Sequence, residues 1–448
     1  MKTKATFLIL LVTSILFVSD VCGQKLNTVK LDSLFDVLSN NNKAMGSVAI
    51  SKNGKLLYTK SIGFSALFDK MKIPATETTK YRIGSITKTF TTVLIFQLIE
   101  EGKLSLTTTL DKYFPSVPNA KSVTISNLLN HRSGIHNFTN DPAYLTWMTK
   151  PKTKDEMVAI IAKSPSDFQP DSKAEYSNSN FVLLGFIIEK LRKKPYSEVL
   201  AERITKKIGL ADTNFGTAAD TKRNESYSYK WMTDKWNQEP ETDMSIPHGA
   251  GAIISTPSDL VRFLESLFAG KLVKPESLLK MKTITDNYGM GLFQFPFDGK
   301  KGFGHTGGID GFASSASYFP DDSLSVAYCT NGQVYPMNDI LIGILSIYFD
   351  RPYSIPTFKT SSYSVKTEDL DKYLGNYSSQ QLPLKITITK NDAVLTAQAT
   401  GQSSFPLDAT EKDRFKFEPA GVVLEFNPEK GEMILKQGGG VFQFTKDK

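Results

Sequence analysis

The sequence has little cysteine and little histidine. Its 448 residues include two cysteines and four histidines. Cys22 lies in the apolar N-terminal segment, so a chain without that segment keeps only Cys329 and cannot form an internal disulfide. Cys329 has apolar neighbours and is expected to be a buried hydrophobic residue. The histidines lack the spacing and the cysteine partners of a zinc site. We therefore expect no metal and no other cofactor.

The sequence also lacks a dense run of basic residues. Its formal net charge is +7, and its lysines and arginines are scattered. A nucleic-acid-binding stripe is therefore not expected. With 40% hydrophobic and 22% charged residues, the composition is that of an ordinary globular protein. The length favours two or three domains, or one large domain with an appendage.

A long apolar run occurs at the N-terminus. Lys2 and Lys4 precede an uncharged run over residues 5–18, and small residues lie before Gln24. This pattern is typical of a secretory signal peptide, predicted here over residues 1–23. The run is too short to span a bilayer comfortably. We predict an exported protein, periplasmic or extracellular, with no transmembrane segment in the mature chain.

Residues 24–350 mix strand and helix signals and predict an α+β domain. Asn53 and Gly54 separate two apolar runs and predict a two-residue hairpin turn. Apolar residues at helical spacing predict a helix over 85–101 that ends at Gly102. Ser258 is the expected cap of a later helix. Further helices are predicted at 180–193, 257–269 and 338–350, and strands at 313–319 and 324–330.

The C-terminal part has a different pattern. Residues 351–365 have the composition of a linker, and we predict a second domain over 366–448. Short alternating runs separated by turn residues favour a small closed β-barrel or a sandwich. The phenylalanines of this region are expected to fill its interior. The predicted strands are 384–388, 394–399, 415–417, 422–426, 433–435 and 441–444.

Ser85 and Lys88 form an S-x-x-K motif at the start of the predicted helix. Three residues apart on a helix, they lie on one face. A lysine with a lowered pKa can take the proton of a serine hydroxyl and so activate it as a nucleophile. The motif occurs a second time, at 277–280, so it carries little information by itself.

Two further motifs follow Ser85 along the chain. Tyr176 and Asn178 form a Y-x-N motif, and residues 305–307 read His-Thr-Gly. A phenol beside a lysine can transfer protons, and an asparagine amide can hold a substrate amide. The histidine and threonine can donate to a carboxylate or carbonyl, while glycines allow close approach of the backbone.

In this order, the three motifs resemble those of the serine β-lactamase and penicillin-binding-protein superfamily, in its class C β-lactamase and D-Ala-D-Ala carboxypeptidase branch. Residues 81–85, 128–135 and 249–260 resemble it as well. The resemblance implies an antiparallel sheet flanked by helices, with an all-helical subdomain and the site in the cleft between them. Residues 370–377 and 395–402 resemble the lipocalin-like barrel appended to many such hydrolases.

The resemblance also implies a role for each motif residue. Ser85 would be the acylated nucleophile, Lys88 its proton acceptor and Tyr176 the proton relay. The implied oxyanion hole consists of the backbone N–H groups of Ser85 and Gly308. The implied substrate-binding residues are Asn178, His305, Thr306 and Gly307.

At position 305 this chain has histidine, whereas most β-lactamases of this branch have lysine at the matching position. A largely neutral imidazole suits the carboxylate of a penicillin less well than a permanent ammonium. Histidine at this position resembles certain D,D-carboxypeptidases, D-amino-acid peptidases and esterases of the same family. The resemblance therefore implies an acyl-enzyme hydrolase of small-molecule or peptide substrates, similar to a D,D-carboxypeptidase or a D-aminopeptidase. D-amino-acid peptides of cell-wall type are the first expected substrates, with peptidoglycan as a candidate partner. A carboxylesterase or β-lactamase is the alternative within the family. A non-catalytic penicillin-binding envelope sensor and a ligand carrier working through the barrel are the alternatives outside it.

Overall fold

The computed structural model describes residues 26–232, 234–358, 363, 365–382, 384–391, 394–400, 404–417, 420–437 and 439–447. The predicted signal peptide, residues 1–23, lies outside the described residues. Within those ranges, no helix combines the length and the apolar character needed to cross a membrane.

The centre of the large domain is a six-stranded antiparallel sheet in the order β10-β11-β12-β13-β1-β2. Asn53 and Gly54 connect β1 to β2 with φ angles of 53° and 76°, so the predicted hairpin turn is confirmed. The strands are β1 (Ala44–Lys52), β2 (Lys55–Ile62), β10 (Phe293–Phe297), β11 (Lys300–Ile309), β12 (Phe312–Phe319) and β13 (Leu324–Gln333).

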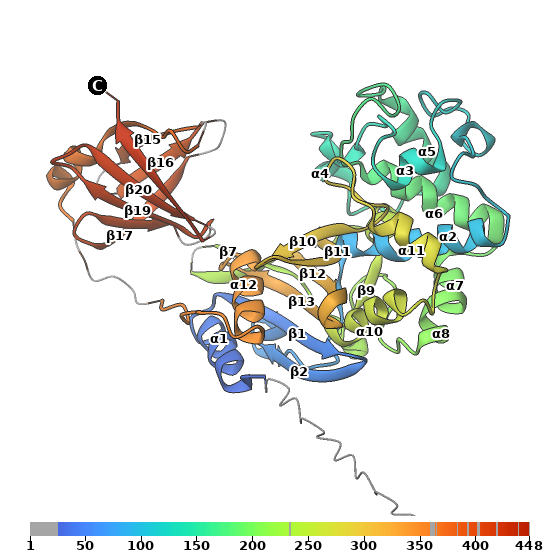
Figure 1. Cartoon of the computed structure of the whole chain (residues 1–448), viewed down its shortest axis with the longest axis horizontal. Coiled ribbons are helices and arrows are strands. Elements are labelled where there is room, and N and C mark those ends of the chain that lie inside the picture. The colour runs from blue at the N-terminus through green and yellow to red at the C-terminus, as the bar shows by residue number, and fades with distance from the viewer. Residues whose placement is uncertain are drawn as a thin grey trace, which may run out of the picture.

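The sheet separates two apolar layers, because side chains alternate between the faces of a strand. Val48 and Ile50 of β1 pack with α1 (Thr28–Asn40) and α12 (Met337–Tyr348). Ala49, between them, belongs to the other layer, which includes α2 and α10. In Figure 1, α1 and α12 lie on the side of the sheet nearer the C-terminal barrel, and α2 and α10 lie toward the helical group.

The two long helices against the second layer begin and end near their predicted bounds. Helix α2 spans Thr87–Glu100 and is followed by Gly102 with φ of 70°. Helix α10 spans Pro257–Phe268. Its cap is Thr256, whose side chain accepts a hydrogen bond from the Asp259 backbone. The expectation that Ser258 is the cap is therefore wrong, because Pro257 already occupies the first helical position.

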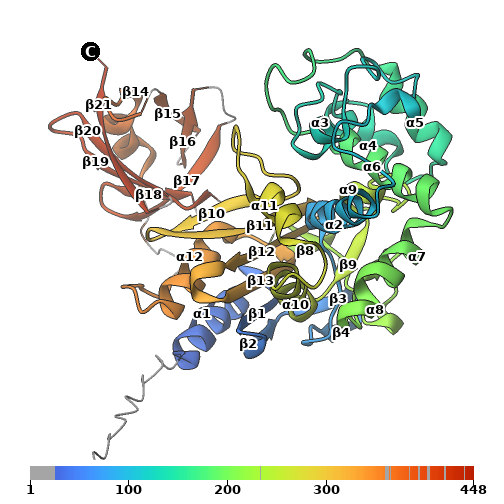
Figure 2. The ribbon, with the colours of Figure 1, turned by 45° about the vertical axis from the view of Figure 1, so that its right-hand side comes forward.

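A group of helices lies beside the sheet (Figures 1 and 2). It contains α3 (Ile125–Leu129), α4 (Tyr144–Trp147), α5 (Lys154–Lys163) and α6 (Asn178–Arg192). The other helices are α7 (Tyr196–Leu200), α8 (Lys206–Ile208), α9 (His248–Gly251) and α11 (Pro275–Lys282). Short strands complete the domain: β3 (Phe64–Phe68), β4 (Met71–Pro74), β5 (Tyr81–Arg82), β6 (Asn214–Phe215), β7 (Tyr229–Met232), β8 (Lys235–Gln238) and β9 (Ile253–Ser255).

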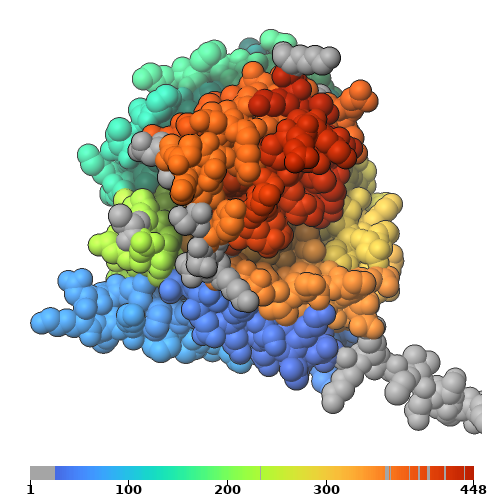
Figure 3. Space-filling view, turned by 90° about the vertical axis from the view of Figure 1, so that its left-hand side faces the viewer, coloured from blue at the N-terminus to red at the C-terminus, as the bar shows by residue number. Residues whose placement is uncertain are grey.

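The C-terminal strands close into an eight-stranded barrel, so the barrel prediction is confirmed and the sandwich is not formed. The barrel faces the viewer in Figure 3. Phe415, Phe426 and Phe444 are buried inside it. The predicted domain boundaries and the lipocalin likeness stay predictions. The strands are β14 (Gly375–Ser378), β15 (Lys385–Asn391), β16 (Val394–Ala399), β17 (Phe405–Glu411), β18 (Arg414–Phe417), β19 (Val422–Asn427), β20 (Glu432–Gln437) and β21 (Gly440–Lys446).

Candidate active site

The hydroxyl of Ser85 lies between a lysine and a tyrosine. Ser85 belongs to a single turn, η1 (Gly84–Ile86), which leads directly into α2. The Lys88 ammonium nitrogen, Nζ, is 3.0 Å from Ser85 Oγ, and the Tyr176 hydroxyl donates to the same oxygen over 2.7 Å. Tyr176 comes from the segment just before α6. The structure therefore brings together the S-x-x-K and Y-x-N motifs, which are about 90 residues apart in the chain.

Lys88 is completely buried. Its Nζ donates to Asn178 Oδ1 over 2.8 Å and to the Ala250 carbonyl oxygen over 2.9 Å. Burial lowers the pKa of Lys88 well below its ordinary value, because the charged ammonium loses its hydration. A neutral amine has two hydrogens and one lone pair. Since the two carbonyl oxygens take both hydrogens, the lone pair is left for Ser85.

Tyr176 packs against a cluster of two other rings. The His131 ring lies 4.5 Å from it and the Tyr288 ring 6.5 Å, measured between centroids. His131 in turn accepts a hydrogen bond from the backbone N–H of Ser177, 3.2 Å from its Nδ1. Burial raises the pKa of the Tyr176 phenol, so the phenol keeps its proton at neutral pH and can donate it.

The orientation of Asn178 is set by its neighbours. Its side-chain nitrogen donates to Thr139 Oγ1 over 3.1 Å, and the Thr139 hydroxyl donates to Asn137 Oδ1 over 3.1 Å. Asn137 Oδ1 also accepts from the Asn178 backbone N–H over 3.0 Å. These contacts turn the carbonyl oxygen of Asn178 toward Lys88. One hydrogen of its amide remains for a substrate carbonyl.

The Gly308 backbone lies against the turn that carries Ser85. Strand β10 pairs with residues 300–304 of β11, so residues 305–309 form an edge that faces this turn. Gly84 has a φ of 50°, and a Cβ atom placed on it would lie 2.8 Å from the Gly308 nitrogen. Only glycine tolerates both the conformation and this contact. The N–H groups of Ser85 and Gly308 are therefore carried by backbone segments in direct contact.

His305 is buried on β11, with 3% of its surface exposed, and its ring lies 4.4 Å from that of Phe293. Burial lowers the pKa of His305 to about 3, because the charged imidazolium would lose its hydration. The imidazole is therefore neutral and supplies no positive charge for a substrate carboxylate. Thr306 and Gly307, the next residues of the strand, are half-buried at the edge that faces the Ser85 turn.

A pocket of about 310 Å³ opens at Ser85 and Gly308. One wall is apolar and comes from the segment 138–148. Among the described residues lining the pocket, Lys230 is the one lysine or arginine, and its Nζ lies 2.6 Å from a Glu239 carboxylate oxygen. The cation is therefore already paired. The apolar wall consists of Phe138, Tyr144, Leu145 and Met148.

Several contacts of this site were not predicted from the sequence. The Ala250 carbonyl is a backbone group, and only the glycines on both sides of it mark a close approach in the sequence. The packing of His131 against Tyr176 depends on the tertiary fold, and no motif marks it in the sequence. The second S-x-x-K motif has no such surroundings: the Ser277 hydroxyl donates to Glu100, and Lys280 is exposed.

The sequence also predicts a buried Cys329 and no metal ion, and both predictions concern groups outside this site. Cys329 is fully buried in β13, as expected, and burial raises the pKa of its thiol. In the part of the chain that the structure describes, no three His, Cys, Asp or Glu side chains are grouped closely enough to hold a metal ion.

Comparison with known proteins identifies the family. Penicillin-binding protein 4* of Bacillus subtilis (strain 168) is 25% identical over 429 residues, which cover 88% of this chain and 93% of that protein. Teichoic acid D-alanine hydrolase of Staphylococcus aureus is 29% identical over 231 residues, which cover 52% of this chain and 56% of that protein. This chain therefore matches little more than half the length of that hydrolase.

A solved structure is similar over most of the large domain. D-amino acid amidase from Ochrobactrum anthropi SV3, complexed with D-phenylalanine, has a TM-score of 0.64 and 26% identity. The similarity covers 72% of this chain and 99% of that one. The sequence profile of the beta-lactamase family matches residues 31–343, well over half of the chain. The chain thus belongs to the beta-lactamase family and is a serine hydrolase.

Proposed function

We propose that this hydrolase cleaves amides of D-amino acids, including D-amino-acid peptides, through an acyl-enzyme on Ser85. The observation that carries the proposal is the environment of Lys88. Two carbonyl oxygens take its hydrogens, so its lone pair is left for the Ser85 hydroxyl 3.0 Å away. A lysine held neutral in this way is a general base for the serine.

Acylation follows from this geometry. Ser85 Oγ attacks the substrate carbonyl carbon while its proton passes to Lys88. The carbon–nitrogen bond then breaks, and the leaving amine takes a proton from the Tyr176 phenol, which is restored by the proton on Lys88. Deacylation repeats the sequence with water as the nucleophile. The proton ends on Ser85, which is regenerated with the free acid as product.

The charge that develops on the carbonyl oxygen needs donors in place before the reaction. The N–H groups of Ser85 and Gly308 are the proposed pair. Loss of one such donor costs about 10²–10³ in rate in other hydrolases. The contact between Gly84 and Gly308 supports this assignment, because it holds the two backbone segments together.

The charges around the pocket favour a substrate without a free carboxylate at the cleaved end. His305 is neutral, and Lys230 is paired with Glu239. An amide, an aminopeptidase substrate or an ester fits such a site better than a penicillin or the C-terminus of a D,D-peptide. The apolar wall at 138–148 suits an apolar side chain on the acyl part. The preference for D-amino acids is inferred from two similar proteins, the D-amino acid amidase and the teichoic acid D-alanine hydrolase.

The location of the enzyme and the order of its substrate classes are proposed from the sequence. Export after removal of residues 1–23 would place the enzyme at the cell envelope, where peptidoglycan fragments are candidate substrates. Simple esters are the second substrate class and β-lactams the third. A non-catalytic sensor is the rival, and the three intact motifs argue against it. Turnover separates the two, because a sensor that is acylated on Ser85 would need the same base but would not release the product.

The test uses purified residues 24–448 beside the Ser85→Ala variant. Hydrolysis of D-phenylalanine amide and L-phenylalanine amide is followed by the release of ammonia. Intact mass is measured after brief incubation with an activated D-amino-acid ester. We expect faster turnover of the D-amide, a mass gain on the unaltered protein, and neither with Ser85→Ala. Equal turnover of both amides would contradict the proposed preference for D-amino acids. If neither substrate is consumed nor labels the protein, the sensor becomes the better explanation.

A further inference from the structure

We propose that the buried ion pair between Arg82 and Asp310 positions the oxyanion hole. Arg82 precedes Ser85 by three residues, and Asp310 follows Gly308 by two. The pair therefore joins the two segments that carry the proposed oxyanion donors. This inference rests on the proposed function, and it assigns Arg82 and Asp310 as positioning residues that do not touch the substrate carbonyl.

The ion pair is short and almost completely removed from solvent. Arg82 Nη1 lies 3.0 Å from Asp310 Oδ2, and the two side chains are 3% and 1% exposed. Asp310 begins the turn that connects β11 to β12, directly after the edge that carries Gly308. Arg82 ends β5, directly before the turn that carries Ser85.

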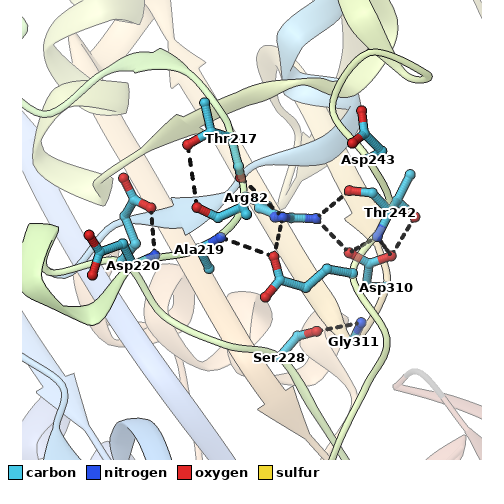
Figure 4. A network of polar contacts seen from close by, with 12 residues as sticks. Arg82, Thr217, Ala219, Asp220, Ser228, Thr242, Asp243, Asp310 and Gly311 are labelled. Atoms are coloured by element: carbon cyan, nitrogen blue, oxygen red, sulfur yellow. Dashed lines mark hydrogen bonds and ion pairs between the residues drawn. The ribbon is translucent and has the colours of Figure 1, made fainter. Parts of the chain in front are cut away.

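The same guanidinium also fixes a wall of the pocket (Figure 4). Arg82 donates to the Thr242 carbonyl oxygen over 2.8 Å and to Glu241 over 2.5 Å. Asp310 accepts from the Thr242 hydroxyl over 2.6 Å and from its backbone N–H over 3.1 Å. Thr242 and Asp310 both line the pocket at Ser85. Three chain segments are thus fixed together around the reacting carbonyl.

A contribution to the free energy of folding does not by itself explain a buried ion pair. Removing two charges from water costs several kcal/mol per ion, and apolar replacements of buried pairs are often neutral or stabilising. What an ion pair does supply is a defined distance and direction between the segments that it joins. The proposed oxyanion donors need this, because a displacement of about 1 Å can cost roughly 10²-fold in rate.

The decisive readout compares an oxygen ester with its thionoester. Sulfur is larger than oxygen and accepts hydrogen bonds poorly, so oxyanion donors accelerate the oxygen ester much more than the thionoester. A fall in the amount of folded enzyme lowers both rates equally. The ratio of the two kcat/KM values therefore reports the oxyanion hole and is insensitive to stability.

The variants are Asp310→Asn and Arg82→Lys, made in residues 24–448. Each keeps the approximate size of the side chain and weakens the ion pair. The matched control is Asp259→Asn: Asp259 is a buried carboxylate that accepts from Thr213 and from the Asp212 backbone, and it does not line the pocket. Circular dichroism and the unfolding temperature are measured for all of them.

We expect kcat for the oxygen ester to fall about 10- to 100-fold in both variants, with a smaller loss for the thionoester. The ratio should therefore fall several-fold, while Asp259→Asn leaves it unchanged. An unchanged ratio in a folded variant would overturn the positioning role even if the rates fall. If one variant fails to fold, the ratio measured for the other variant still tests the positioning role. If the unaltered enzyme cleaves neither ester, the proposed function fails first, and that outcome is distinct from an unchanged ratio.

Discussion

At the scale of single residues, the proposed mechanism depends on Lys88, whose pKa is lowered by burial. We expect Lys88→Ala to lower the rate of Ser85 acylation by about 10³-fold, because the serine then lacks its base. The fold should persist, since alanine suits the first turn of α2. Mass labelling by an activated ester measures the rate. Lys280→Ala, at the second S-x-x-K motif, is the matched control and should label normally. Labelling of Lys88→Ala at the unaltered rate would show that another group is the base.

His305 is the residue of β11 that the resemblance predicts to face a substrate carboxylate. Its neutral ring is packed against Phe293. A lysine at this position carries a flexible stem that can bring its ammonium to the solvent side. We expect His305→Lys to raise kcat/KM for a D-peptide with a free carboxylate relative to the matching D-amide. Parallel assays of the two substrates measure this. An identical ratio in variant and parent would count against the electrostatic explanation of specificity.

At the scale of elements, the pocket wall at 138–148 is anchored by His136. Its ring nitrogens lie 2.8 Å from Asp167 and 3.2 Å from Asp141. Burial lowers the pKa of His136, but the hydrogen bonds and charges of the two aspartates outweigh it, and the net pKa is raised. The protonated form therefore stabilises the fold. This contribution is complete below the unfolded-state pKa of about 6.5 and is lost as the pH rises through the higher folded-state pKa.

The corresponding prediction compares the free energy of unfolding at pH 6 and pH 9. The parent should lose about 0.5 kcal/mol more than His136→Gln over this interval, a small value because the site is close to solvent. Urea unfolding at each pH measures it. If the free energy of unfolding changes equally with pH in parent and variant, the pKa of His136 does not differ between the folded and unfolded states.

Sequence patterns predicted elements with a clear period and missed those without one. Helix α2 was found because its apolar residues recur at helical spacing and Gly102 ends it. Strand β14 (Gly375–Ser378) was missed because four mixed residues show no alternation. Strand β17 (Phe405–Glu411) was missed because it contains Pro406 and acidic residues. The apolar pocket wall lies in an irregular segment, and which of its side chains meet Ser85 depends on tertiary packing.

For the candidate site, the polar groups could be identified from the sequence, but little of their geometry could be predicted. The order of the three motifs pointed to Ser85, Lys88 and Tyr176, and the structure places them within hydrogen-bonding distance. The Ala250 carbonyl and the contact of Gly84 with Gly308 are backbone features, so no side-chain pattern could specify them. The roles of the site residues stay predictions until the variants are measured.

At the scale of the whole molecule, the barrel and the hydrolase domain have separate cores. The buried residues of the barrel form one cluster, and those of the large domain form two others on the faces of its sheet. Close contact occurs at Gly421, where an added Cβ atom would lie 2.8 Å from an Asp339 carboxylate oxygen at the start of α12. The site lies next to the cluster that includes α2 and α6, and the described barrel residues contribute nothing to the pocket lining.

This separation leads to a prediction about the barrel. A chain of residues 24–363 should keep the Ser85 acylation rate within about twofold for a small activated ester, because each core buries its own apolar surface and folds as a unit. Activity on cell-wall fragments is measured in parallel, since a barrel that holds a large substrate would affect only that activity. Loss of labelling with a small ester, in a truncated chain whose circular dichroism shows a folded domain, would contradict this independence and mean that the Ser85 site needs the barrel. Loss confined to the cell-wall fragments, with labelling unchanged, would mean that the barrel binds the large substrate, which is the part of the ligand-carrier alternative that this test can support.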